Sequence, residues 1–287
     1  VLFRSACVSL SRCNALVRHG TRCSGAEHDK TGIPFCVARA CIEVDVMTRN
    51  RFLLLVAGVA TTAALGYVAS RRNWFLPRGD HGRGSIEYRV AQYGARVDAR
   101  LRPAFSRAGV AYPPAEVALL AFKDARVMEV HARAAFGDPW RYIKTYVVRG
   151  ASGKAGPKLA EGDRQVPEGV YQIEMLNPSS FAHLSLRLNY PNAFDRRMGA
   201  ADCRKNIGSY IMIHGGWWSI GCLAMGDDAA EDLFVLTARV SKENVRVLIA
   251  PTDFRLEPPR SIMHEPRWVA MLYASLNEEL KQFHRKA

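Results

Sequence analysis

The chain has 287 residues, of which 48% are hydrophobic and 23% carry a charge. These fractions are ordinary for globular proteins and exclude a largely disordered chain, and the length corresponds to roughly two domains of about 150 residues. The seven cysteines are too few to build a small disulfide-rich protein, and no C-x-x-C pair supports a structural zinc site. The net charge of +13 favours an anionic partner such as nucleic acid, anionic lipid or a carboxylate-rich cell wall. We expect no nucleic-acid partner, because the chain has no RNP-like aromatic motif, no zinc finger and no run of lysine and arginine.

The N-terminal part of the chain divides at Met47. Residues 1–46 hold five of the seven cysteines and show neither a strand period nor a helix period. From Met47 a short basic segment leads into the uncharged apolar run 52–69, which Arg71 and Arg72 follow. Because a targeting signal begins a protein, we expect Met47 to be the natural start and residues 1–46 to be a disordered, non-native upstream extension. A genuine cysteine-rich extension is the alternative.

The segment 47–72 predicts export. The apolar run 52–69 fits the core of a signal peptide, and the residues 64–66 provide small side chains for cleavage. The 18 residues of this run also lie near the lower limit for spanning a bilayer, so a single uncleaved N-terminal membrane anchor is equally compatible. Arginines on both sides of the run leave its orientation undecided.

Apolar periodicity predicts the order of elements in the rest of the chain. A helix is expected over 85–109, within an N-terminal helical segment 85–115, with Pro103 ending or kinking it and a linker at 112–114. The Gly-, Pro- and Lys-rich segment 150–167 predicts a long loop. Short runs of branched and aromatic residues predict strands at 117–122, 125–131, 142–148, 170–176, 183–188, 210–213 and 245–250.

Two further helices are expected in the C-terminal half. Asp228 and Glu231 have the spacing of a capping box and predict the start of a helix with an apolar stripe. Apolar residues at helical spacing between 268 and 283 predict an amphipathic helix within the C-terminal segment 252–287. The whole pattern predicts an α+β protein that is mainly β, with a catalytic-sized domain over 117–251 flanked by helices.

A histidine and a cysteine form the strongest chemical signal in the chain. His214 follows a short apolar run, and Cys222 comes eight residues later across a loop that contains Gly215, Gly216 and Gly221. Glycines allow such a loop to fold back, so the imidazole can approach the thiol, lower its pKa and make it a nucleophile. Gly221 also leaves backbone N–H groups open to a developing oxyanion. For either residue alone, a buried cysteine or a histidine bound to a backbone carbonyl is the alternative.

This region resembles the signature of the YkuD-type L,D-transpeptidases, in which His-Gly follows an apolar strand and Ser-x-Gly-Cys comes after it. Four segments are similar to the YafK-like murein branch of that family: GPKLAEGDRQVPEGVY at 156–171, HLSL at 183–186, YPNAFD at 190–195 and SIGCLAM at 219–225. The resemblance covers roughly residues 87–255. It implies a mainly β catalytic domain of the YkuD kind, a β-sandwich or barrel, that requires no cofactor.

By position, the resemblance implies that Cys222 is the nucleophile and His214 the proton acceptor and donor. It implies that the carbonyl of Gly215 orients the imidazole, and that the backbone of Gly221 and Cys222 forms the oxyanion hole. Most of the family has Ser-His-Gly-Cys, whereas this chain has SIGC at 219–222 and a shorter spacing between histidine and cysteine. The YafK-like branch shares that departure, which puts substrate positioning and the outcome of the reaction in question.

Residues around this motif are candidates for substrate contact: Lys158, Asp163, Arg164, His183, Trp217, Trp218 and Ser219. The charged residues of the long loop pair with carboxylates and amines of a peptide substrate, or they form an ordinary solvated loop. His183 lines the cleft or is bound by backbone in a strand. The two tryptophans stack on sugar or shape a lid, and at least one is expected to be buried as an anchor of the loop. Cys203 is expected to be a bystander, Asp195 and Arg196 to form a local turn, and the histidines, which lack ligand spacing, to hold no metal.

The resemblance implies a cysteine acyl-transferase that acts on peptidoglycan. Cys222 attacks the carbonyl at the L-centre of diaminopimelate in a tetrapeptide stem, D-alanine leaves, and a thioester remains for an amine acceptor. That acceptor is the diaminopimelate amine of a second stem or a wall-linked lipoprotein. With water as acceptor, the same site becomes a murein amidase or peptidase, and a non-catalytic wall-binding module is a third alternative. Because this substrate lies outside the cytoplasmic membrane, we expect the domain in the periplasm, with membrane contact through residues 52–69 if they are not cleaved.

Overall fold

The computed structural model describes residues 84–259 and 265–284, which all belong to the compact unit Ala57–Ala287. The expected upstream extension 1–46 and the export segment 47–72 lie outside the described residues. No helix in the described part of the chain is long and apolar enough to cross a membrane.

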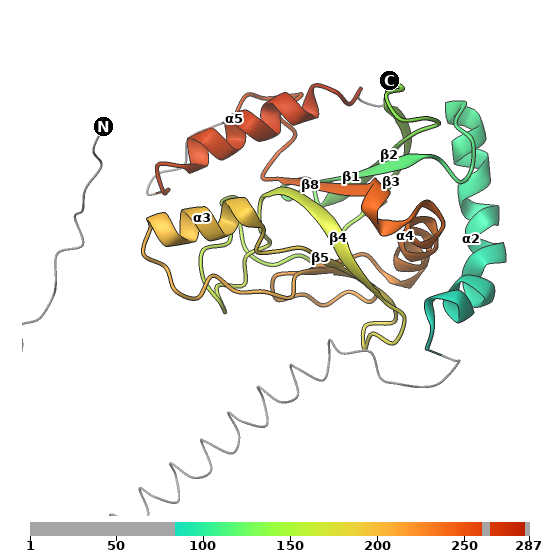
Figure 1. The fold of residues 1–287 in the computed structure, drawn as a ribbon, viewed down its shortest axis with the longest axis horizontal. Helices are drawn as coiled ribbons and strands as arrows, with labels where there is room; N and C mark the ends of the chain where they lie inside the picture. Colours follow the sequence, from blue (N-terminus) through green and yellow to red (C-terminus); the bar gives the residue numbers. More distant parts are fainter. Residues whose placement is uncertain (1–83, 260–264, 285–287) are drawn as a thin grey trace, which may run out of the picture. The chain divides into compact units, whose positions relative to one another are not determined.

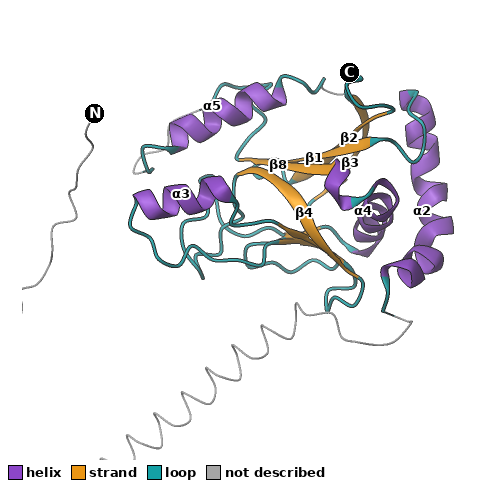
Figure 2. Cartoon of the chain, viewed as in Figure 1, coloured by secondary structure: helices purple, strands orange, loops and turns teal. Residues whose placement is uncertain are grey.

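Four α-helices, one short 3-10 helix and eight strands make up the described residues (Figure 2). In chain order they are α2 (Ile86–Ala108), β1 (Glu116–Phe122), β2 (Val127–Arg133), β3 (Arg141–Val147), β4 (Gly169–Asn177), β5 (Ser185–Leu188), α3 (Ala193–Ala201), β6 (Met212–His214), β7 (Leu223–Ala224), α4 (Asp227–Val240), η1 (Lys242–Asn244), β8 (Val245–Ala250) and α5 (Val269–Leu280). The strands form one sheet in the order β3-β2-β1-β8-β4-β5-β6-β7. β1 pairs with β8, and β6 with β7, in parallel, while the other neighbours are antiparallel. The expectation of a mainly β, α+β protein with flanking helices is confirmed.

Strand β1 separates two apolar cores. Successive side chains of a strand point to opposite faces of the sheet. Alternate residues of β1 accordingly belong to different cores, with Val117, Leu119 and Ala121 in the larger and Ala118, Leu120 and Phe122 in the smaller. Helices α2 and α4 cover the first face and α5 covers the second (Figure 1). Burial on both faces explains why the sequence of this strand is an unbroken apolar run.

Helix α2 continues past Pro103 to Ala108. Pro103 was expected either to end or to kink the helix, and the first of these expectations is wrong. The helix ends at Gly109, whose left-handed φ of 67° suits glycine. A proline inside a helix costs about 3 kcal/mol, because it removes one backbone hydrogen bond and its ring crowds the preceding turn. Leu101 and Phe105 are buried on either side of Pro103, and packing of this apolar stripe against the core offsets that cost.

Residues 193–201, where a local turn around Asp195 and Arg196 was expected, form helix α3 instead. The Asn192 side chain accepts a hydrogen bond from Asp195 N (3.0 Å), and the Asp195 carboxylate accepts one from Asn192 N (2.9 Å). These reciprocal bonds form a capping box. Asparagine and aspartate take the places where serine or threonine and glutamate are usual, so the standard sequence pattern does not reveal it.

The capping box expected at Asp228 and Glu231 does not form. Helix α4 begins at Asp227. Its N-cap residue is Gly226, which has no side chain to accept a hydrogen bond from the first turn. Glu231 forms ion pairs with α2 instead. The C-terminal amphipathic helix is present as α5, which covers the second face of the sheet.

Candidate functional site

His214 and Cys222 lie at the ends of neighbouring strands. His214 ends β6, Cys222 immediately precedes β7, and the two parallel strands pair with His214 opposite Ala224. Adjacent strands are about 4.8 Å apart and each residue advances about 3.3 Å, so this register puts the two Cα atoms roughly 8 Å apart. A hydrogen bond from Met225 N to His214 O (2.8 Å) holds the chain where it folds back.

The imidazole of His214 is buried and neutral. Its Nδ1 lies 2.6 Å from Gly215 O, and since a carbonyl oxygen only accepts, Nδ1 carries the hydrogen and Nε2 keeps its lone pair. Burial lowers the pKa of His214 below its ordinary 6.5, while the bond to Gly215 acts in the opposite direction. At neutral pH the ring is therefore ready to accept a proton at Nε2.

The position of Gly215 leaves no room for a larger residue. A Cβ atom there would lie 2.6 Å from Asp227 Oδ1, 2.8 Å from Ala182 O and 3.0 Å from His183 Cβ. Asp227 also accepts a hydrogen bond from Gly216 N (2.8 Å). The carbonyl that binds His214 is thus held between the turn before β5 and the start of α4.

Ser219 organises the turn that leads to Cys222. Its Oγ accepts hydrogen bonds from Gly221 N (3.3 Å) and Cys222 N (2.9 Å), and it donates to Cys222 O (2.6 Å). The two N–H groups expected to form an oxyanion hole therefore both contact this hydroxyl. Gly221 has a φ of 120°, and a Cβ atom there would lie 3.2 Å from Gln165 O of the long loop, so glycine is needed at this position. Cys222 Sγ lies 3.8 Å from Tyr210 O.

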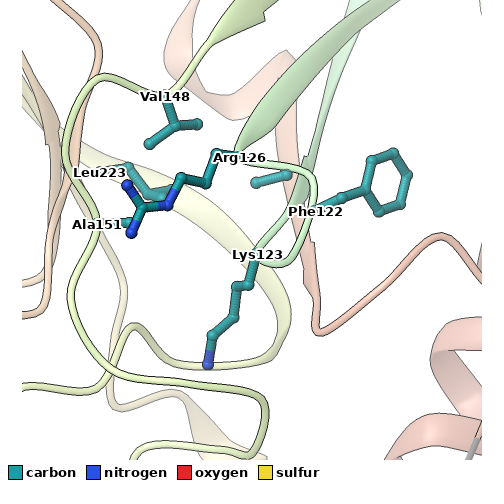
Figure 3. A pocket seen from close by; sticks show the side chains of 7 residues that line it. Phe122, Lys123, Arg126, Val148, Ala151 and Leu223 are labelled. Carbon is teal, nitrogen blue, oxygen red and sulfur yellow. The ribbon is translucent and has the colours of Figure 1, made fainter.

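A narrow crevice adjoins the strand that follows Cys222 (Figure 3). Its lining residues are Ala121, Phe122, Lys123, Arg126, Val148, Ala151 and Leu223. It is almost wholly apolar and has no room for a water molecule. Arg126 extends across it towards Ala151 and Leu223, whereas Lys123 turns away towards the long loop (Figure 3). The crevice is therefore part of the packing behind β7, too tight for a ligand.

Comparison with known proteins identifies the domain. Residues 121–248 match the family model of the YkuD L,D-transpeptidase catalytic domain. A curated protein of Escherichia coli K12, described as "Putative L,D-transpeptidase YafK", is 33% identical over 115 residues, which cover 39% of this chain and 44% of that protein. The protein of the same description from Escherichia coli O157:H7 matches equally. Residues 121–248 thus match a YkuD-type L,D-transpeptidase catalytic domain, and this part of the chain is similar to the YafK-like branch. It spans less than half the length of these curated relatives.

Solved structures that match part of this chain include the helical cell shape determining protein Pgp2 of Campylobacter jejuni, with 22% identity and a TM-score of 0.40, covering 56% of this chain and 54% of that one. Bd1075 of Bdellovibrio bacteriovorus has 20% identity and a TM-score of 0.35, covering 58% of this chain and 55% of that one.

In the long loop of the YkuD-type domain, Lys158 and Asp163 are paired with each other. Lys158 Nζ lies 2.6 Å from Asp163 Oδ1, and the lysine side chain is only 4% exposed. Burial alone would raise the pKa of Asp163, but hydrogen bonds from Lys158 and from three backbone N–H groups of the loop hold it below its ordinary value. Arg164 is exposed, and its side chain has no acidic partner in the described part of the chain. Of the three charged candidates, Arg164 is the one whose side chain is available to a substrate.

His183 and the two tryptophans differ from expectation. His183 lies in the turn before β5, in a left-handed conformation (φ 71°), and its Nε2 binds Glu231 Oε1 (2.8 Å), so the expected backbone partner in a strand is wrong. Trp217 and Trp218 are 77% and 55% exposed, so the expectation that one of them is buried as an anchor is also wrong. Backbone contact holds the loop instead, because Gly150 packs directly on Trp217 O.

Sequence patterns missed a buried acidic pair on α4 of the YkuD-type domain. Glu231 and Asp232 are 2% and 1% exposed. Asp232 accepts hydrogen bonds from Tyr146 OH (2.7 Å) and from Arg100 Nε (2.7 Å), and Glu231 accepts one from Arg96 Nε (2.8 Å). The available signal was two adjacent acids directly before the apolar run 233–236, together with two arginines four residues apart on an earlier helix.

Within residues 84–259 and 265–284, no three His, Cys, Asp or Glu side chains gather as a metal site would require. Cys203 is exposed in a left-handed turn after α3 (φ 56°), and within the described residues no disulfide joins it to Cys222. His214 and Cys222, with Gly215, Ser219 and the neighbouring loops around them, make up the candidate site.

Proposed function

We propose that this protein is an exported, cysteine-dependent L,D-transpeptidase that acts on peptidoglycan stem peptides. The observation that carries the proposal is the register of β6 and β7, which brings a buried, neutral His214 and Cys222 to adjacent strand ends of a YkuD-type domain. A neutral imidazole with an available Nε2 is what a general base for a thiol requires.

In the acylation step, His214 Nε2 takes the proton of the Cys222 thiol, and Sγ forms a bond to the carbonyl carbon at the L-centre of diaminopimelate. The carbonyl π electrons move to oxygen and give a tetrahedral oxyanion. When the oxyanion collapses, the C–N bond to D-alanine breaks, and the imidazolium gives its proton to the leaving amine. A thioester between Cys222 and the shortened stem remains.

The N–H groups of Gly221 and Cys222 are proposed to stabilise the oxyanion. Both contact Ser219 Oγ in the absence of substrate, so the hydroxyl must release them or share them as the oxyanion forms. Ser219 is therefore proposed to hold the turn around the nucleophile rather than to bind the stem peptide.

In the second step, an amine attacks the thioester carbonyl, loses a proton to His214, and forms an amide while the thiol is restored. The proposed acceptor is the diaminopimelate amine of a second stem, or a wall-linked lipoprotein. Water attacking the same face would release a free acid and make the protein a murein hydrolase, because both acceptors use the same base.

Substrate contacts are proposed for the exposed side chains near the site. Arg164 carries an exposed guanidinium on the long loop, which suits a stem carboxylate. Trp217 and Trp218 expose aromatic faces on which the apolar side of a sugar can stack. The pair Lys158 and Asp163 is proposed to shape the loop rather than to contact substrate.

The test is to incubate the full chain with purified disaccharide-tetrapeptide and to identify the products by mass. Loss of D-alanine with formation of a cross-linked dimer supports the transferase, and loss of D-alanine with only the tripeptide supports the hydrolase. Cys222→Ala should abolish turnover and covalent labelling by a carbapenem, whereas the matched control Cys203→Ala should retain both. Labelling that persists in Cys222→Ala overturns the proposed nucleophile.

Export has its own test. Alkaline phosphatase fused after residue 287 folds only in an oxidising compartment outside the cytoplasm. An active fusion supports export of the domain. A stable, full-size but inactive fusion retained in the cytosol overturns both the export and the cell-wall substrate.

A further inference from the structure

Helix α2 lies outside the part of the chain that matches the YkuD domain, yet it contacts the turn that backs His214. Arg89 Nε donates to Pro178 O (2.9 Å), and the ring of Tyr93 lies 5.3 Å from the ring of His183. α2 also packs alongside α4 (Figure 1). The turn 178–184 is thus held from one side by a helix that the domain match does not include.

Glu231 joins both helices to His183. Its buried carboxylate accepts hydrogen bonds from Arg96 Nε (2.8 Å) and Arg100 (3.1 Å) of α2, and it lies 2.8 Å from His183 Nε2. Burial would raise the pKa of Glu231, but the bonds from Arg96, His183 and Arg100 outweigh it and hold the pKa below its ordinary value. Glu231 is therefore an ionised acceptor at neutral pH, and its bond to His183 is charge-assisted.

His183 in turn lies against Gly215, whose carbonyl orients the proposed base His214. Its Cβ lies only 3.0 Å from where a Cβ on Gly215 would sit, and Leu184 O accepts a hydrogen bond from Gly215 N (3.1 Å). Gly215 O is the group that binds His214 Nδ1. Any shift of the turn at 183–184 is therefore passed directly to the backbone that fixes the imidazole.

From these contacts we propose that His183 is a positioning residue for His214, and that Glu231, clamped by Arg96 and Arg100 of α2, holds His183 in place. The contacts run from α2 through Glu231, His183 and Gly215 to the imidazole. This inference rests on the proposed function, because it matters only if His214 acts as the base. It gives α2 an indirect part in catalysis, for which α2 does not need to contact the substrate.

The expected effect is a partial loss of base catalysis. Complete loss of a general base slows a reaction by roughly 10²–10⁴-fold. A base that is present but loosely oriented retains part of that factor, since a displacement of about 1 Å can cost up to about 10²-fold. Breaking the bond between His183 and Glu231 should therefore slow acylation of Cys222 by about 10-fold to 100-fold.

The test uses two variants of the full chain and a matched control. His183→Asn keeps a residue type that tolerates the left-handed backbone but has too short a side chain to reach Glu231. Glu231→Gln keeps the shape of the acceptor and removes its charge. The control Arg246→Ala breaks a more exposed ion pair far from His214 in the sheet order, that of Arg246 with Glu279 (2.6 Å), which joins β8 to α5.

Carbapenem acylation is measured against pH in each variant, with unfolding by urea measured in parallel. Both test variants should acylate more slowly, and the acidic limb of their pH profiles should move up towards 6.5, because a loosened His214 becomes better solvated. The control should keep the wild-type rate and profile. The double variant should be no slower than the slower single variant, because the two residues act through one contact.

Two outcomes separate this inference from the function on which it rests. If His214→Ala acylates at the wild-type rate, the proposed base is wrong. If His214→Ala is slow but His183→Asn and Glu231→Gln both keep the wild-type rate and pH profile, the positioning role alone is overturned. Lower stability in either variant without a change in its pH profile likewise overturns it, since a purely structural role predicts that result.

Discussion

Replacing Lys123 with methionine tests how the long loop at 150–167 is held beside the nucleophile. Lys123 follows β1, and its Nζ donates to Gly156 O (2.8 Å) and Val166 O (2.9 Å) at the two ends of the loop. The same ammonium lies 2.9 Å from Glu168 Oε1, with side chains 6% and 0% exposed. Burial lowers the pKa of Lys123, while the nearby Glu168 carboxylate opposes that shift. One buried cation therefore ties both arms of the loop to the sheet.

The size of the effect follows from what the variant leaves behind. Lys123→Met removes the cation but leaves the Glu168 carboxylate buried, and among the described residues it keeps hydrogen bonds from Gly156 N and Tyr273 OH (2.8 Å each). Removing one partner of a buried ion pair typically costs about 3–5 kcal/mol, because a buried charge is left uncompensated. With a urea m-value of about 2.5 kcal/mol/M, a loss of about 4 kcal/mol lowers the midpoint of unfolding by about 1.6 M.

Equilibrium unfolding in urea, followed by tryptophan fluorescence, measures this loss. The matched control is Lys154→Met, an exposed lysine of the same loop, for which a change within about 0.5 kcal/mol is expected. Adding Glu168→Gln to Lys123→Met should recover part of the stability, because the stranded charge is then removed. A Lys123→Met variant within 1 kcal/mol of wild type would refute the reasoning.

Two further predictions concern groups near the fold's polar turns. Burial raises the pKa of Asp195 from 3.8 to about 6, so the folded protein binds this proton more tightly than the unfolded chain, and the free energy of unfolding should fall as pH rises from 4 to 6. Asp195→Asn should remove that slope and gain about 1–3 kcal/mol at pH 7, and urea curves that stay parallel to wild type across this range would contradict it. Ser219→Ala should lower the free energy of unfolding by about 1 kcal/mol and slow acylation, because the Cys222 turn loses its hydroxyl acceptor. Ser219→Thr keeps a hydroxyl and should restore both in the same urea and carbapenem assays, and no recovery would mean that the hydroxyl is not responsible.

Several elements were predictable because they depend on local pattern. The apolar run at 117–122 is strand β1, and the helical stripe after Asp227 is α4, since burial of one face or both dictates the residue types. His214 and Cys222 are separated by a short glycine-containing loop, so only one turn of the chain was needed to bring them to adjacent strands.

Charge partners were not predictable. Arg96 and Glu231 are 135 residues apart in sequence, and no local pattern selects that pairing. The sequence made Lys158 a candidate for substrate contact. In the structure its side chain is buried in the loop and forms an ion pair with Asp163. At least one of the two tryptophans beside the site was expected to be a buried anchor, because large aromatic side chains are usually buried. Both are exposed, and packing of Gly150 on the backbone of Trp217 holds that loop.

By itself, the sequence determined the helices α2, α4 and α5, most of the strands and the mainly β class, and it singled out His214 and Cys222 as the candidate reacting pair. Tertiary structure alone decided that His183 joins Glu231 to the backbone around His214, and that Arg164 rather than Lys158 has a side chain available to a ligand. The reason is physical. Apolar periodicity reports burial locally, whereas a buried charge is stable only beside a partner, and here elements distant in the chain supply that partner.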